Sequence, residues 1–179
     1  MGCVECNRRV RREESYCEAC LDRFFETTFE RLGNVVREAG DIYLGRSGNP
    51  ERRLFEHFAD SSRDHLAILH WSDNKDAIAE LERELISEFE HRWKQTNVHR
   101  ESVGRWPRTG WSCVYLSWRW KASAAPPKGL RPRTLREFDY EGPEDPSWNF
   151  CDPPTILTAR ISREEARGLV ADYRAQFRP

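Results

Sequence analysis

Four cysteines in the first twenty residues constrain this chain more than any other feature of its sequence. They form two CxxC pairs, Cys3 with Cys6 and Cys17 with Cys20, and the ten residues between the pairs suffice for a short hairpin. Each pair can clamp one side of a metal ion. Four soft thiolates make a closed tetrahedral set, which is typical of structural Zn²⁺ and leaves no open position for catalysis. The sequence therefore predicts a structural zinc site, with free core thiols and a redox CxxC motif as the alternatives.

Composition predicts a soluble, globular chain that is long enough to bury a core. The 179 residues are 38% hydrophobic and 33% charged. We find no apolar run of membrane-spanning length and no signal-peptide pattern after Met1. We therefore expect a cytoplasmic protein without a membrane partner, in which reduced thiols bind metal and do not form disulfides.

The first half of the chain contains alternating helix and strand signals. Apolar residues recur at helical spacing over residues 21–32, and Gly33 is the expected end of that helix. Val35-Val36 and residues 42–44 predict the two strands of a hairpin. Residues 45–48 are expected to form the loop that follows it.

Asn49-Pro50 is a good cap and first-turn pair for the next helix, on which Arg53 and His57 share a face. A buried strand is expected at 66–69. Asp73 is the expected cap of a helix reaching about residue 92, and Glu82 falls inside its apolar stripe. A carboxylate on the buried side of a helix needs a partner or a metal ion, although a Glu at the border of the stripe is commonly half exposed.

The second half predicts strands at 111–120 and at 156–161, with a long proline-rich loop at 124–154 between them. A Ser162 to Glu165 capping box then opens a last helix. Together these signals predict an α/β (α+β) fold with a small mixed or antiparallel sheet flanked by helices. We expect a zinc knuckle with its linking helix at 1–32, a core at 33–98 and a basic, Trp-rich C-terminal extension at 99–179.

Positive charge is concentrated between residues 91 and 140. That stretch holds 11 Lys and Arg against 3 acidic residues, a balance of +8 in a chain whose net charge is −1. Tryptophans interleave with these basic residues, and such a mixture can stack bases and hold phosphates. We expect nucleic-acid contacts from Arg105, Arg108, Arg119 and Lys121. The alternatives are a solvated basic surface and tryptophans that belong to the core.

Several motifs in residues 33–98 follow one another in an order that resembles the GIY-YIG nuclease family. Tyr43-Leu44-Gly45 resembles the YIG motif, and Arg53 stands ten residues later, at the position of the catalytic arginine. The run from Leu81 to Ile86 resembles the L-E-x-x-L-I signature with Glu82 as its metal ligand. Asn97 is similar to the asparagine that closes the module. The family's first motif ends in tyrosine, whereas the nearest match here, Gly33-Asn34-Val35, ends in valine.

The resemblance implies a divalent-metal-dependent endonuclease that hydrolyses nucleic-acid phosphodiester bonds. Tyr43 would act as the general base or orient it, Arg53 would stabilise developing negative charge, and Glu82 would bind Mg²⁺ or Mn²⁺. The expected partner is nucleic acid, with DNA preferred over RNA, and a protein partner or assembly is a further expectation.

Three more residues receive roles from the same resemblance. Arg46 would supply a cation beside Tyr43 or grip a flanking phosphate, His57 would assist proton transfer, and Asn97 would orient the substrate or the Glu82 helix. Each residue also has a structural alternative, such as a turn position for Arg46 or helix packing for His57. The competing function is a catalytically inactive, nuclease-like module that binds nucleic acid or serves as an adaptor.

Overall fold

A five-stranded mixed sheet with helices on both faces forms the fold in the computed structural model, which describes residues 2–11, 14–93, 110–121, 133–136 and 150–176. The sheet order is β1-β3-β2-β5-β4, and all neighbours are antiparallel except β4 and β5. The strands are β1 Ala39–Ser47, β2 His65–Ser72, β3 Ser112–Trp120, β4 Arg133–Leu135 and β5 Phe150–Ala159. The helices are α1 Glu18–Glu38, α2 Pro50–Ser61, α3 Lys75–Trp93 and α4 Arg163–Gln176. The expected mixed α/β class, with a sheet flanked by helices, is confirmed.

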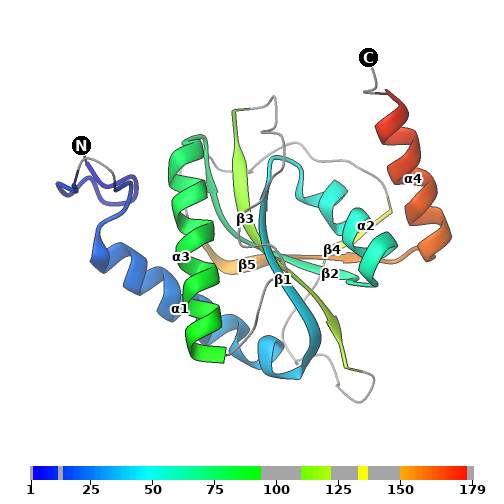
Figure 1. Cartoon of the computed structure of the whole chain (residues 1–179), viewed down its shortest axis with the longest axis horizontal. Helices are drawn as coiled ribbons and strands as arrows, with labels where there is room; N and C mark the ends of the chain where they lie inside the picture. The colour runs from blue at the N-terminus through cyan, green and yellow to red at the C-terminus, as the bar shows by residue number, and fades with distance from the viewer. Residues whose placement is uncertain (1, 12–13, 94–109, 122–132, 137–149, 177–179) are drawn as a thin grey trace.

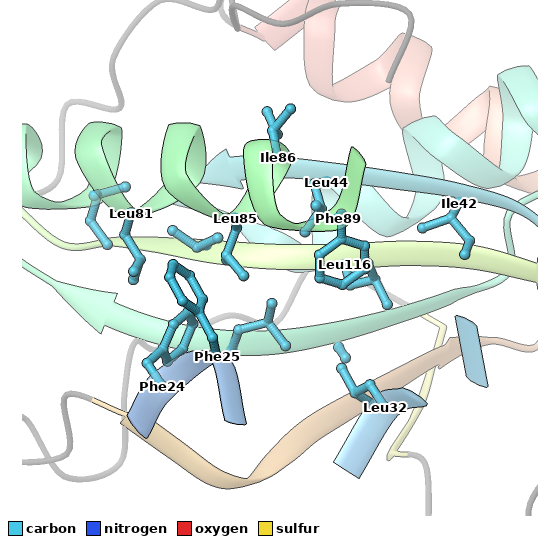
Figure 2. Packing of buried hydrophobic residues seen from close by; sticks show 14 of the residues in the cluster. Phe24, Phe25, Leu32, Ile42, Leu44, Leu81, Leu85, Ile86, Phe89 and Leu116 are labelled. Atoms are coloured by element: carbon cyan, nitrogen blue, oxygen red, sulfur yellow. The ribbon is translucent and has the colours of Figure 1, made fainter. Parts of the chain in front are cut away.

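Two separate apolar clusters divide the molecule into three layers. Successive side chains on a strand point to opposite faces, so Leu44 and Leu116 pack toward α1 and α3, while Tyr43 and Tyr115 pack toward α2 and α4. Figure 1 shows these two pairs of helices on opposite sides of the sheet. Figure 2 shows how α1, α3, β1 and β3 meet in the first cluster, where its labelled side chains include Phe24, Phe25, Leu32, Leu44, Leu81, Leu85, Phe89 and Leu116.

Helix α1 continues beyond its expected end at Gly33, and the predicted hairpin is wrong. Leu32 and Val35 are fully buried, because they continue the apolar stripe of α1 against the sheet. Val35-Val36 therefore belongs to a helix, and β1 begins only at Ala39. The loop predicted at 45–48 is also wrong over most of its length, because β1 runs through Gly45 to Ser47.

The strand that pairs with β1 comes from much later in the chain. Strand β3 lies between β1 and β2 and is antiparallel to both; Gly45 pairs with Tyr115 and Tyr43 with Ser117. The ranges 33–98 and 99–179, which we expected to form a core and an extension, thus contribute strands to one sheet.

Local capping signals place the starts of α2 and α4 correctly. The side chain of Asn49 accepts a hydrogen bond from the Arg52 backbone N–H at 2.9 Å. Ser162 and Glu165 form the expected reciprocal box. Helix α3 is capped by Asn74, whose side chain accepts from Ala77, and not by Asp73.

The second half of the chain differs from expectation in one further segment. The loop predicted at 124–154 contains strand β4 and the first residues of β5. In the part of the chain that the structure describes, no helix combines the length and the apolarity needed to cross a bilayer.

Candidate metal centre and candidate active site

The four N-terminal cysteines converge on one point. Their sulfur atoms all lie within 4.8 Å of one another, and the Cys6 and Cys17 Sγ atoms are 3.5 Å apart. Among the described residues, this is the one group of three or more potential His, Cys, Asp or Glu ligands close enough to share an ion. Cys113, in contrast, is buried on β3 in the cluster that faces α2 and α4.

The donor chemistry of this four-cysteine cluster fits a thiolate-bound metal. The Cys17 backbone N–H donates to Cys3 Sγ at 3.3 Å. Burial raises the pKa of Cys3, but hydrogen bonds from the backbone at Cys17, Cys6 and Glu5 outweigh it and lower the pKa to about 7. Backbone donors that stabilise a thiolate favour the protonation state in which Cys binds metal. The cysteines are therefore positioned to hold a metal ion, and four thiolates suit a structural zinc.

The cysteine module is anchored on the main fold by the residues just before its second pair. The Tyr16 hydroxyl and His70 Nε2 on β2 are 2.6 Å apart in a buried hydrogen bond. The Ser15 backbone N–H donates to Glu80 on α3 at 2.8 Å. Because Cys3, Tyr16 and Cys20 are part of the same core cluster as α1 and α3, the module and the main fold share one interior.

A second group of polar side chains gathers around β1, the strand at one edge of the described sheet. The Tyr43 and Tyr115 rings lie side by side on the face toward α2, with centroids 6.3 Å apart. They lie over Gly45. A Cβ on Gly45 would be 2.6 Å from Tyr43 Cε1 and 2.8 Å from the Tyr115 hydroxyl. Glycine is thus needed here for the close approach of both tyrosines.

His57 on α2 completes the tyrosine cluster, a name we use for Tyr43, Tyr115 and His57. Its ring centroid lies 4.7 Å from that of Tyr43, and its Nε2 is 2.9 Å from the Tyr115 hydroxyl. Burial lowers the pKa of His57 to about 3, with help from the positive charges of Arg63 and Arg53. The imidazole is therefore neutral at physiological pH.

Two arginines border the tyrosine cluster, each held by a carboxylate. Arg53 on α2 donates to Glu56 at 2.7 Å. Arg63, which follows α2, pairs with Asp41 at 3.0 Å, and its guanidinium carbon lies 5.3 Å from the centre of the Tyr43 ring. Burial and the charge of Glu82 raise the pKa of Tyr43, while the two arginines act in the opposite direction. Tyr43 is thus a neutral phenol in the absence of a further nearby cation.

Glu82 approaches the same edge from the other side of the sheet. Its carboxylate on α3 is 3.3 Å from Arg46 Nε, and the two side chains are only 8% and 17% exposed. Burial raises the pKa of Glu82, and the charges of Arg46 and Arg53 partly offset that effect. Because Arg46 and Tyr43 point to opposite faces of β1, the site wraps around the edge of the sheet.

A divalent ion at Glu82 would need water and substrate for its remaining ligands. Glu82 supplies a single carboxylate, and it is paired with Arg46. Mg²⁺ commonly binds through one or two carboxylates and takes its remaining ligands from water and phosphates. Glu82 would be the residue that holds such an ion.

The structure brings together five of the six residues nominated from the sequence as catalytic. These are Tyr43, Arg46, Arg53, His57 and Glu82, which hydrogen bonds, ring contacts or charge interactions link into one group. Asn97 lies outside the described residues.

Of the four residues expected to contact nucleic acid, the structure describes Arg119 and Lys121. Arg105 and Arg108 lie outside the described residues. Arg119 is exposed near the end of β3. Lys121 donates to the Arg37 carbonyl oxygen at 2.9 Å, a contact that satisfies the C-terminal end of α1.

Sequence reasoning missed Tyr115, Arg63 and Asp41. Tyr115 stands in an alternating run, so the sequence predicted that it lies on a strand. The sequence did not predict which strand pairs with it, because the register between strands distant in sequence depends on tertiary packing. Arg63 lies two residues after the end of α2, and Asp41 is the third residue of β1. No sequence motif distinguishes either residue.

Comparison with models of known protein families, with curated proteins and with solved structures yielded no match.

Proposed function

We propose that this chain is a divalent-metal-dependent nuclease that hydrolyses phosphodiester bonds, with a site resembling that of the GIY-YIG family. One observation carries the proposal: Tyr43 and Tyr115 meet over Gly45, beside His57 and Arg53 and within electrostatic reach of Glu82. Phosphodiester hydrolysis needs a positioned water, a cation at the phosphate and stabilised negative charge on the phosphoryl oxygens. Residues suited to these roles lie together at one edge of the sheet.

Tyr115 supports the family resemblance at the point where the sequence departs from it. The first motif should provide a strand that ends in tyrosine and pairs with the Tyr-Leu-Gly strand, but Val35 lies in α1. Strand β3 takes the place next to β1 and brings Tyr115 opposite Gly45. We infer that a strand later in the chain supplies the tyrosine that the first motif lacks.

The roles follow from charge and exposure. Arg53 remains charged, because its pKa is raised by Tyr115, Glu56 and Tyr43 in spite of its burial, and it would stabilise charge that develops on the phosphate. Tyr43, less buried than Tyr115, would orient or deprotonate the attacking water. A divalent ion bound by Glu82 would supply Lewis acidity at the phosphate. The four-cysteine cluster would hold a structural zinc that keeps the N-terminal module folded.

The test is a cleavage assay of the full chain on duplex DNA, single-stranded DNA and RNA with Mg²⁺ or Mn²⁺. Glu82→Gln should reduce cleavage to background, because the substitution keeps the shape of the side chain and removes the charged metal ligand. The matched control is Glu84→Gln on the same helix, which should cleave like the wild type. Circular dichroism should show both variants folded. Equal cleavage by the Glu82→Gln variant, or no cleavage by the wild type on any substrate, would refute the proposal.

The second candidate is a nuclease-like binding module without activity, and one observation favours it. The buried Arg46–Glu82 ion pair is complete without a metal, so an ion would have to compete with the arginine for the carboxylate. This candidate predicts that the wild type binds oligonucleotides, with no cleavage at any metal concentration, and that Glu82→Gln leaves the affinity unchanged.

A further inference from the structure

Arg63 and Asp41 form an ion pair at the border of the site that none of the roles above uses. Arg63 follows Ser62, which ends α2 in a left-handed conformation with φ of 63°. Two of its nitrogens face the Asp41 carboxylate, Nε at 3.0 Å and a terminal nitrogen at 3.3 Å. The terminal nitrogen donates a hydrogen bond to Asp41 Oδ1, and the Nε contact is an ion pair without hydrogen-bond geometry; together they hold the guanidinium beside Asp41.

The remaining nitrogen of Arg63 decides where His57 carries its proton. It lies 3.4 Å from His57 Nδ1, a long hydrogen bond. A guanidinium donates and never accepts, so Nδ1 must be the acceptor. The positive charge of Arg63 acts in the same direction, because it disfavours a proton on the nearer nitrogen. A neutral imidazole has one N–H, which is therefore at Nε2.

The other end of the imidazole faces Tyr115. His57 Nε2 is 2.9 Å from the Tyr115 hydroxyl, so the Nε2–H group donates to the phenol oxygen. The hydroxyl hydrogen of Tyr115 then cannot point at His57 and is directed to another acceptor. Burial raises the pKa of Tyr115 well above its usual value, which keeps that hydrogen in place at neutral pH.

We propose that Arg63, held by Asp41, is a positioning residue that fixes the His57 tautomer and thereby holds Tyr115 as an acceptor from His57, so that the Tyr115 hydroxyl hydrogen is free for the candidate site. The catalytic half of this inference rests on the proposed nuclease function; the tautomer half does not. The two tyrosines then have different tasks. Tyr43, the more exposed of the two, acts on the water, and the buried Tyr115 acts through its hydrogen bonds behind it.

The tautomer can be read directly from ¹⁵N NMR of the histidine rings in the full chain. The protein has five histidines, and the signal lost in a His57→Gln variant identifies the one required. In the wild type, Nε2 should show the shift of a protonated nitrogen and Nδ1 that of an unprotonated one. Arg63→Met should reverse the two, because Tyr115 can then donate to Nε2.

Three further variants separate this role from a merely structural one. Arg63→Lys keeps a cationic donor and should retain the wild-type tautomer. Asp41→Asn weakens the hold on Arg63 and should give a mixture of tautomers, and it serves as the test if Arg63→Met does not fold. The matched control is Arg52→Met, an arginine of α2 that pairs with Glu56, and it should leave the His57 shifts unchanged.

Each outcome bears on the inference. An unprotonated Nε2 in the wild type, or an unchanged tautomer in Arg63→Met, overturns it. For cleavage, Arg63→Met should lower kcat at least about 10-fold with little change in KM, since the hydrogen bonds of His57 and Tyr115 beside the reacting groups are rearranged, and Arg63→Lys should restore kcat. A reversed tautomer with unchanged kcat would overturn the role assigned to Tyr115. A wild type with the expected tautomer but no cleavage refutes the nuclease function and supports the tautomer assignment.

Discussion

Substituting Gly45 with alanine tests the tyrosine pair at the centre of the candidate site. The added Cβ would lie 2.6 Å from Tyr43 Cε1, 2.8 Å from the Tyr115 hydroxyl and 3.0 Å from Tyr115 Cζ. Non-bonded carbon atoms prefer separations of about 3.5 to 4.0 Å, so both rings must shift by roughly 1 Å. Tyr115 is only 2% exposed and hydrogen-bonded to His57, which leaves its ring little room to move.

The magnitude follows from two opposing effects. Over-packing a well-filled interior costs about 1 to 3 kcal/mol. Replacing glycine in a strand with alanine recovers about 0.5 to 1 kcal/mol of backbone entropy. The two ranges leave a net cost of about 0 to 2.5 kcal/mol, so we expect Gly45→Ala to lower the free energy of unfolding by about 1 kcal/mol and to weaken the His57–Tyr115 hydrogen bond.

Urea unfolding followed by circular dichroism gives the measurement, and Gly168 gives the control. Gly168 is exposed on α4, and a Cβ there meets no atom within 4 Å. Gly168→Ala should therefore stabilise the protein by up to about 1 kcal/mol through helix propensity. The same chemical change should have opposite signs at the two sites.

A double-mutant cycle isolates the contact itself. Tyr43→Ala removes the nearest atom, so the cost of Gly45→Ala should shrink in that background. If Gly45→Ala is as stable as the wild type, or if its cost is the same with and without the Tyr43 ring, the close approach of the tyrosines to β1 is wrong.

Three other predictions concern the metal, the histidine and the basic surface. Reduced protein should contain one zinc per chain by elemental analysis, and Cys20→Ser should lose it while Cys113→Ser retains it. Below about pH 6.5 His57 is protonated in the unfolded chain, whereas in the folded chain it stays neutral down to about pH 3. The free energy of unfolding should therefore fall as the pH is lowered, by up to about 1.4 kcal/mol per pH unit more in the wild type than in His57→Gln, as measured by urea titration at several pH values. Nucleic-acid affinity, measured by fluorescence anisotropy, should weaken steeply with salt, and Arg119→Glu should weaken it further at low salt; a salt-independent affinity would exclude a phosphate-contacting role.

The sequence predicts those parts of the fold that local chemistry decides. Asn49 and Pro50 identify the start of α2, because a side-chain acceptor and a fixed φ suit the first helical turn at any place in a fold. Residues 66–69 lie inside β2, and the inward Glu82 is placed correctly by the 3.6-residue period of α3. Tyr43 and Arg53 could be nominated because the motifs that resemble the GIY-YIG family are local in sequence, and His57 because it shares a helix face with Arg53.

The errors occur where distant parts of the chain decide the outcome. Val35-Val36 has high strand propensity, but Val35 also falls on the buried stripe of α1, and packing against the sheet outweighs propensity. Tyr115 could not be joined to Tyr43 from sequence, because nothing local states which strand will pair with β1. For the same reason the ion pair between Arg63, just after α2, and Asp41 on β1 could not be predicted from the sequence.

Because β3 lies between β1 and β2, co-translational folding cannot complete the sheet until residues 112–120 have been synthesised. Residues 39–93 emerge before 112–120 and carry Tyr43, Arg53 and Glu82, but their strands β1 and β2 are not neighbours in the finished sheet, and β3 must pair between them. Pairing across such sequence distances is slow, because the chain must close long loops before contacts compensate for them. The site around β1 therefore stays incomplete on the nascent chain until β3 has been translated and brings Tyr115 beside Gly45.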